Sequence, residues 1–147
     1  MHLAQQIEPH IHADSAADTV TLDYESRFLR RKRLVTDHGE AFLVELAETS
    51  SIDEGQGFRL DDGRVIAVRA AAEQLLEVRH DNLVRMAWHI GNRHTPCQMA
   101  ADHLLIRADG VLQAMLEQLG ARVTTVTAPF TPEGGAYGHG RTHGHAH

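Results

Sequence analysis

The sequence predicts an α+β protein with a small all-β domain, a βαββαβ domain and a flexible histidine-rich tail. Three observations support this prediction. Short stretches of alternating polarity fill the first half of the chain, helical spacing of apolar residues begins only after residue 73, and apolar patterning stops after Pro129. We therefore expect domain boundaries at residues 1–72, 73–137 and 138–147.

The region between Thr19 and Ala70 carries the signals of short strands. The stretch TVTLDY alternates β-branched and apolar residues with polar ones, as a half-buried strand does. The stretch RRKRLVTDHGEAFLVEL is typical of two strands around a turn at Asp37–Gly39, and FRLDDGRVIAV of a hairpin with its turn at Asp62–Gly63. Although AFLVELAE is also compatible with a helix, no long helix is expected in this half.

The second half alternates strands with two helices. In DNLVRMAWHIGNR, apolar residues recur at helical spacing, Asp81 or Asn82 is a suitable N-cap, and Gly91 is the expected C-terminal breaker. A second helix is expected in DGVLQAMLEQLG, from Asp109 to Gly120. The expected strands are EQLLEVR, two short ones in CQMAADHLLIRA, and ARVTTVTA. This order, β-α-β-β-α-β, is that of the ferredoxin-like arrangement.

Charge and hydropathy exclude several classes of protein. Lys and Arg number 14 against 20 Asp and Glu, so the net charge of −6 argues against a general nucleic-acid binder. No apolar run approaches the roughly 18 residues that a membrane span needs, and the start of the chain lacks the pattern of a signal peptide. A cytoplasmic protein that binds neither nucleic acid nor membrane is the simplest expectation.

Histidine is unusually frequent, with 12 residues in 147, and four of them close the chain: His139, His143, His145 and His147. Small residues separate the last three, which lets an extended backbone turn several imidazoles toward one ion. Histidine-rich tracts indicate metal binding. The alternatives are a solvated tail without a role or an expression tag, although a tag is normally an uninterrupted run.

The stretch HIGNRHTPCQ contains the sharpest internal signal. His94 follows the expected end of the first helix and lies on a connection, where binding residues are often found. A capping or hydrogen-bonding role for His94 remains an alternative. Cys97, the single cysteine, is more consistent with a small apolar residue than with a ligand or a nucleophile paired with His94. The chain contains no H-E-x-x-H, G-x-S-x-G or Walker A motif, so we do not expect an enzyme.

A dense basic run, SRFLRRKR, lies inside this acidic chain. Its cations are either one solvated face and edge of a strand or a docking patch for an acidic partner protein. The candidate partner-binding residues are Arg27, Arg30, Arg31, Lys32 and Arg33.

The motifs HIGNRHTPCQ, DGVLQAMLEQLG and APFTPEGGAYGHG, together with YESRFLRRKR and LDDGRVIAVRAAAEQLLEV, resemble those of the urease accessory protein UreE family. The resemblance covers nearly the whole chain. It implies a homodimeric nickel metallochaperone that carries Ni²⁺ to apo-urease with other accessory proteins, including the GTPase UreG. It also implies an N-terminal domain like a chaperone peptide-binding module and a ferredoxin-like domain that carries the metal.

The resemblance also implies which residues bind nickel. His94, in G-N-R-H, is the principal ligand, and its two copies meet near the dimer axis; the tail histidines add further ligands. The stretch IRADG at 106–110 lacks the histidines that some family members carry there, so auxiliary sites are not expected. Imidazole also suits Zn²⁺ and Cu²⁺, so a cytoplasmic zinc or copper buffer that uses the same histidines remains the alternative function. Since imidazole binds metal in its neutral form, affinity should fall as pH drops through about 6.5.

Overall fold

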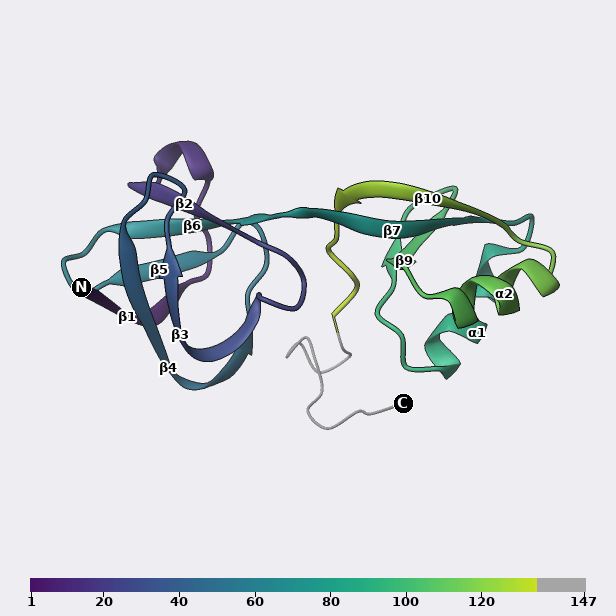
Figure 1. The fold of residues 1–147 in the computed structure, drawn as a ribbon, viewed down its shortest axis with the longest axis horizontal. Helices are drawn as coiled ribbons and strands as arrows, with labels where there is room; N and C mark the ends of the chain where they lie inside the picture. The colour runs from purple at the N-terminus through teal and green to yellow at the C-terminus, as the bar shows by residue number, and fades with distance from the viewer. Residues whose placement is uncertain (135–147) are drawn as a thin grey trace. The chain divides into compact units, whose positions relative to one another are not determined.

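The computed structural model describes residues 1–134 of the chain. It divides into two compact units, Met1–Ala71 and Ala72–His147, of which each is considered by itself. Figure 1 shows an all-β first unit and a second unit with two helices. The tail expected at 138–147, including its four histidines, lies outside the described residues.

The first unit is a six-stranded sheet with the strand order β2-β6-β5-β1-β4-β3. A short 3-10 helix, Ala13–Ser15, precedes β2. The strands are β1 His2–Glu8, β2 Asp18–Leu22, β3 Phe28–Val35, β4 Ala41–Ser51, β5 Gly57–Leu60 and β6 Val65–Ala70. The inward side chains form one apolar core that includes the ring pair Phe42 and Phe58, with centroids 5.9 Å apart. The predicted all-β N-terminal domain is confirmed, and the ambiguous AFLVELAE is a strand.

Hydrogen bonds join the two edges of this sheet. The Asp37 N–H, just after β3, donates to the Thr19 carbonyl on β2 at 2.8 Å. The Asp37 carboxylate also accepts from the hydroxyls of Thr19 and Thr21, at 2.5 and 2.9 Å. Because β2 and β3 stand at opposite ends of the strand order, these bonds close the curled sheet.

The sequence pattern does not predict β1, although this strand lies in the middle of the sheet. This strand pairs in parallel with β4 and antiparallel with β5. Only Ala4 of its seven residues is buried, and Gln5 and Gln6 are exposed. An alanine gives little apolar signal, so HLAQQIE lacks the alternation that identifies a strand.

The second unit has the predicted βαββαβ order. Its elements are β7 Ala72–Arg79, α1 Leu83–Asn92, β8 Gln98–Met99, β9 Leu104–Arg107, α2 Gly110–Gln118 and β10 Arg122–Pro129. The sheet order is β10-β7-β9-β8, and all neighbours are antiparallel. Both helices cover the same face of the sheet in Figure 1 and share one apolar core with it. The α+β prediction is therefore confirmed, and within residues 1–134 neither helix is long and apolar enough to cross a membrane.

The helix starts follow the predicted capping residues. The side chain of Asn82 accepts from the Arg85 N–H at 3.1 Å, and that of Asp109 accepts from the N–H groups of Val111 and Leu112 at 2.9 and 3.1 Å. The expected role of Gly91 as the breaker of the first helix is wrong, because Gly91 lies inside α1, one residue before its end.

Candidate metal centre

His94 lies directly after the C-terminal cap of α1. Its N–H donates to the Gly91 carbonyl at 2.9 Å, and the Thr95 N–H donates to the Ile90 carbonyl at 3.4 Å. This pair of bonds is the Schellman motif, which requires a left-handed residue where the chain leaves the helix. His94 is that residue, with φ of 57°, and it is exposed.

Helix α2 ends with the same motif but a different residue. The Gly120 N–H donates to the Glu117 carbonyl and the Ala121 N–H to the Leu116 carbonyl, both at 3.0 Å. Gly120 takes the left-handed position at φ of 90°, as glycine does without steric cost. Among residues 1–134, His94 is the only non-glycine residue with positive φ. An imidazole held where glycine fits better indicates a functional position.

Cys97 is three residues from His94, but its side chain belongs to the apolar core of the second unit. Burial, followed by the negative charge of Glu133, raises the pKa of the Cys97 thiol to about 11. The metal-free thiol therefore stays protonated at neutral pH, which counts against a Cys–His nucleophile.

Three other histidines of the second unit have structural contacts. His80 bridges the helices, since its Nδ1 accepts from the Asn82 N–H at 2.8 Å and its Nε2 lies 3.1 Å from the Leu119 carbonyl oxygen. His103 pairs with Asp102 at 2.7 Å. His89 packs edge-on against Trp88, with centroids 5.1 Å apart. Because Nδ1 of His80 accepts a hydrogen bond from Asn82, the ring proton is on Nε2. Both ring nitrogens of His80 are therefore engaged at the helix ends, which indicates a capping residue and not a metal ligand.

The described residues contain one group of three side chains with metal-binding atoms near one another: His2, Asp61 and Asp62. These groups already pair among themselves and with a cation. Nδ1 of His2 lies 2.6 Å from Asp61, its Nε2 lies 3.5 Å from Asp62, and Asp62 lies 2.7 Å from Nε of Arg64. We therefore interpret the group as ion pairs that tie β1 to the β5–β6 turn.

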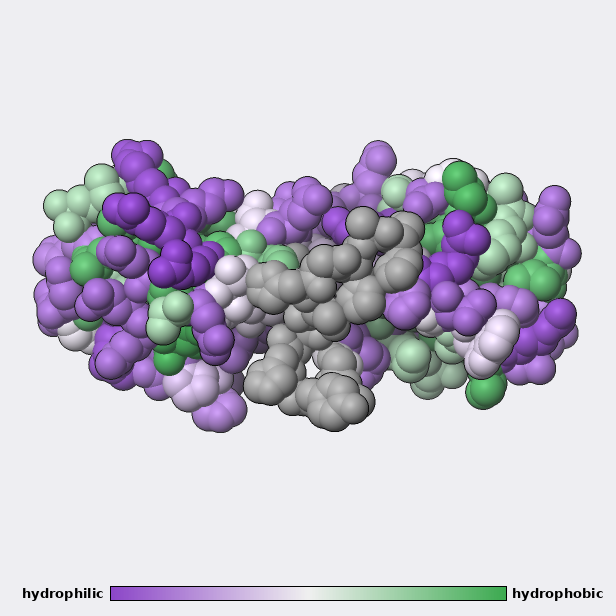
Figure 2. All heavy atoms as spheres, turned by 90° about the horizontal axis from the view of Figure 1, so that it is seen from below, coloured by the Kyte–Doolittle hydropathy of each residue, from purple (hydrophilic) through white to green (hydrophobic). Residues whose placement is uncertain are grey.

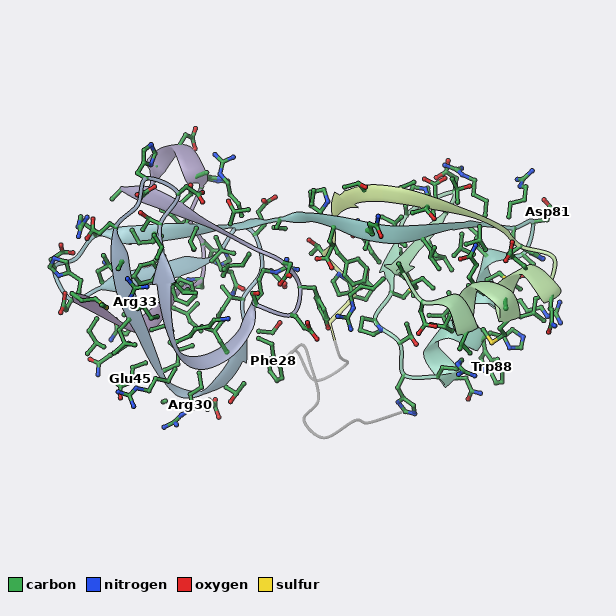
Figure 3. All side chains as sticks on the ribbon, viewed as in Figure 1. Phe28, Arg30, Arg33, Glu45, Asp81 and Trp88 are labelled. Atoms are coloured by element: carbon green, nitrogen blue, oxygen red, sulfur yellow. The ribbon has the colours of Figure 1, made fainter. Side chains whose placement is uncertain are left out.

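Four consecutive cations on β3 are exposed: Arg30, Arg31, Lys32 and Arg33. Because successive side chains of a strand point to opposite faces, four consecutive exposed residues mean that both faces of β3 reach solvent here. Figure 3 labels Arg30 and Arg33. Only Arg31 has a carboxylate of the described residues within ion-pair distance, Glu45 at 3.9 Å. We define these four residues as the basic strand segment.

The expected placement of Arg27 on this exposed face is wrong. Its side chain is fully buried, and its guanidinium donates to the Leu22 carbonyl at 3.1 Å. The guanidinium carbon also lies 5.8 Å from the centre of the Tyr24 ring. Arg27 therefore belongs to the interior of the first unit, a position that sequence spacing within a basic run does not reveal.

The outer side of α1 carries exposed apolar side chains. Val84 and Trp88 are 82% and 63% exposed and stand one helical turn apart. Figure 2, which looks at the helix side of the second unit, shows hydrophobic residues among the polar ones there, and Figure 3 labels Trp88 on α1. We define Val84 and Trp88 as the apolar stripe. One further helical turn along α1 is Asn92, two residues before His94, so the stripe runs along the helix toward the end that carries the candidate ligand.

The chain that leads to the histidine tail returns to the loop after His94. The Thr131 N–H donates to Oε1 of Gln98 at 2.9 Å, and the Glu133 N–H donates to the Cys97 carbonyl at 2.9 Å. The structure thus brings Thr131 and Glu133 to the loop that follows His94, while the four predicted tail ligands lie outside the described residues.

Comparisons with known proteins match both halves of the chain to the same family. A family model of the UreE urease accessory protein N-terminal domain matches residues 2–71, and a model of its C-terminal domain matches residues 65–147. A urease accessory protein UreE from Ruegeria pomeroyi is 61% identical over 136 residues, which cover 92% of this chain and 91% of that protein. A urease accessory protein UreE from Rhodobacter capsulatus is 55% identical over 147 residues, which cover 100% of this chain and 94% of that protein. One from Paracoccus denitrificans is 61% identical over 123 residues, which cover 84% of this chain and 79% of that protein.

Proposed function

Because the chain belongs to the UreE family of urease accessory proteins, we propose that it is a homodimeric metallochaperone that delivers Ni²⁺ to apo-urease. The observation that carries this proposal is the position of His94. The histidine is exposed, stands in a backbone conformation that favours glycine, and lies beside the segment that leads to the tail.

The metal site is proposed to combine two sources of imidazole. His94 from each subunit forms the shared pair, because a two-fold axis turns one ligand per chain into two. His139, His143, His145 and His147 supply the remaining ligands. Nickel is the cargo, so the site must release it, and Zn²⁺ or Cu²⁺ can occupy the same imidazoles.

The apolar stripe of α1 is the proposed contact between the two subunits. Val84 and Trp88 are exposed, and Trp88 lies six residues before His94 in the chain. A two-fold axis through this surface would bury both side chains and bring the two His94 residues together.

The basic strand segment is the proposed docking surface for the urease machinery. Its four cations stand on the edge of an otherwise acidic protein, so they attract an acidic surface of apo-urease or of the GTPase UreG. The relatives are named accessory proteins, and the buried Cys97 thiol offers no nucleophile, which supports a role other than catalysis.

A nickel titration of the purified protein tests the site. A His94→Ala chain that ends after Tyr137 should lose nickel binding, since all five proposed ligands are absent. His89→Ala removes a histidine from α1, the helix that precedes His94, and should bind nickel as the unmodified chain does. Undiminished stoichiometry and affinity in the truncated His94→Ala chain would refute the site.

The effect of the protein on urease activity distinguishes the proposed nickel chaperone from the alternative, a zinc or copper buffer. If the protein delivers nickel, deleting its gene at limiting nickel should lower urease activity, and the full-length gene should restore it. Unchanged urease activity would favour the buffer.

A further inference from the structure

One outward-facing part of the six-stranded sheet is apolar. On β4, Phe42, Val44 and Leu46 point into the core of the first unit. Because successive side chains of a strand point to opposite faces, Ala41 and Leu43 point outward, and both are only partly buried. The solvated face of a sheet normally carries polar side chains, so two successive apolar residues at outward positions indicate a contact surface.

The two strands beside β4 extend this apolar area. Leu3 of β1 is paired with Leu43 and precedes the buried Ala4, so it points outward. Val35 of β3 is paired with Ala41 and is 46% exposed. Residues that are paired across neighbouring strands lie on the same face, so apolar side chains from three strands are adjacent here.

The cations of β3 are divided between the two faces of the sheet. Arg33 is paired with Leu43, and Arg31 with Glu45, so both arginines point outward beside the apolar side chains. Lys32 stands between them and points to the opposite face, although it is also exposed. Figure 3 labels Arg33 and Glu45 on these strands. We call six residues of the outward side the mixed face: Leu3, Arg31, Arg33, Val35, Ala41 and Leu43.

Nearby carboxylates leave the arginines of the mixed face available to a partner. Glu45 lies 3.9 Å from Nε of Arg31, and both side chains are well exposed, so this pair is weak. Asp61, which follows β5, is paired with His2 at 2.6 Å. Among residues 1–134, no carboxylate lies within ion-pair distance of Arg33. A carboxylate of a partner can therefore pair with Arg33 without displacing an existing ion pair.

We propose that the mixed face docks a segment of apo-urease in which apolar side chains adjoin carboxylates. The inference rests on the proposed function, which makes urease the partner, and it assigns the contact to one face of the basic strand segment. The apolar side chains of the partner cover Leu3, Leu43 and Val35, and its carboxylates pair with the two arginines. A nucleic acid has no apolar side chains to offer and is repelled by the net charge of −6, so the face fits a protein.

Binding of the nickel-free full-length protein to immobilised apo-urease tests the mixed face with a matched pair of charge reversals. Arg33→Glu should weaken binding at least about tenfold, because it places a carboxylate against the carboxylates of the partner. Lys32→Glu makes the same change in charge one residue away, on the opposite face. It should weaken binding by less than about twofold.

Two apolar substitutions test the other half of the contact. Leu43→Thr should weaken binding about three- to tenfold at every salt concentration, whereas the loss from Arg33→Glu should shrink as salt screens the charges. Val35→Thr keeps a β-branched shape at an exposed position and should weaken binding about twofold even if Leu43→Thr proves unstable. The urea midpoint of each chain is the control for folding.

Four results would overturn the proposal. Equal losses in Arg33→Glu and Lys32→Glu would mean that long-range attraction, and not one face, holds the partner. Unchanged affinity in the folded apolar variants would remove the apolar contact. A lower light-scattering mass for Arg33→Glu would mean that the face lies between two copies of this chain. Binding of the unmodified protein to the purified GTPase UreG, with none to apo-urease, would assign the face to another partner.

Urease activity at limiting nickel separates this surface from nickel delivery. If Arg33→Glu loses docking and fails to restore urease activity in a strain that lacks the gene, while Lys32→Glu restores it, both proposals are supported. If Arg33→Glu loses docking but restores full activity, the surface stands and its part in nickel delivery fails. If Arg33→Glu docks normally while loss of the gene lowers urease activity, the proposed function stands and the surface fails.

Discussion

At the scale of single residues, His94 and Gly120 form a natural pair, because they occupy equivalent positions in the Schellman motifs that end α1 and α2. A residue with a Cβ atom pays roughly 1 kcal/mol in the left-handed conformation. We therefore expect His94→Gly to be more stable than His94→Ala by about 1 kcal/mol, and Gly120→Ala to lose about 1 kcal/mol relative to the unmodified chain. Urea unfolding of the four metal-free proteins measures both differences.

The two changes at position 94 differ only in backbone strain, since both remove the imidazole. Both should therefore lose the same nickel binding, although their stabilities differ. Equal stability of His94→Gly and His94→Ala would contradict a strained left-handed conformation at this position. At Gly120 a Cβ atom would meet His80 no closer than 3.5 Å, so the expected loss comes from φ and not from a clash.

Single residues also show where sequence reasoning succeeds. Gly120 was identified as a helix end because glycine announces the left-handed position. The sequence does not identify His94 as the left-handed residue that ends α1, because histidine is not typical of that position. The nearby Gly91 is, so the helix end was predicted there. Arg27 was misplaced for a similar reason: a basic run predicts exposure, and only the fold reveals that one of its members turns inward.

At the scale of elements, the turn between β3 and β4 holds β2 through a charged pair. Nδ1 of His38 lies 2.7 Å from the Asp18 carboxylate. The hydrogen bond that His38 donates to the Asp18 carboxylate, followed by the negative charge of Asp18, raises the pKa of His38 from the ordinary 6.5. Although desolvation by burial opposes it, bonds from His38, Thr36 and the Thr19 N–H lower the pKa of Asp18 from 3.8 to about 2.

This pair predicts a pH window for its contribution to stability. The raised pKa of His38 means that its contribution is complete below about pH 6.5 and is lost as pH rises through the folded-state value. The lowered pKa of Asp18 means that its contribution is present above about pH 3.8 and is lost as pH falls toward 2. The urea midpoint of His38→Gln should therefore fall furthest below that of the unmodified chain between about pH 4 and 6.5.

The control for this measurement is His10→Gln. His10 is exposed and has no ion pair within residues 1–134, so its substitution should shift the midpoint equally at all pH values. A gap for His38→Gln that stays constant from pH 4 to 9 would contradict the pair. Because His38 is exposed, the effect should be small, and the shape of the pH profile is the informative quantity.

Elements were predictable where local chemistry specifies them. The turns at Asp37–Gly39 and Asp62–Gly63, the capped helices and the β-branched ARVTTVTA were all found from the sequence. Strand β1 was not, because its single buried residue is a small alanine and its place in the sheet depends on partners far along the chain. Pairing between strands that are distant in sequence produces no pattern in the sequence of either strand alone.

At the scale of the whole molecule, the proposed dimer depends on the apolar stripe of α1. Introducing Val84→Asp and Trp88→Asp would bury unpaired carboxylates in that contact, at a cost of several kcal/mol. The dimer dissociation constant should therefore rise at least about 100-fold. Light scattering should then report the mass of one chain, 16.3 kDa, and the proposed dimer predicts twice that mass for the unmodified protein.

Thr124→Asp is the matched control for this change, because it adds a charge at an exposed position of β10 outside the stripe. It should leave the dimer intact. Persistence of the dimer in the Val84→Asp, Trp88→Asp chain would place the subunit contact elsewhere.

The candidate site shows what a sequence leaves open at this scale. Histidine composition and the G-N-R-H motif identify His94 and the tail histidines as candidate ligands, and this assignment stays a prediction. The contacts of Thr131 and Glu133 with Gln98 and Cys97 could not be foreseen, because they depend on two backbone donors and on the amide of Gln98, which carry no sequence signature. That the chain crosses from β10 to β8 follows from strand order, which only the folded sheet defines.

The left-handed histidine has a consequence for how this protein would change under selection. In a library screened for thermal stability alone, glycine should be enriched at position 94, since it suits the turn better than any residue with a side chain. In a library screened for urease maturation, histidine should be retained against that pressure. Position 94 would thus report, through its amino-acid frequencies, whether a population is being selected for folding or for metal delivery.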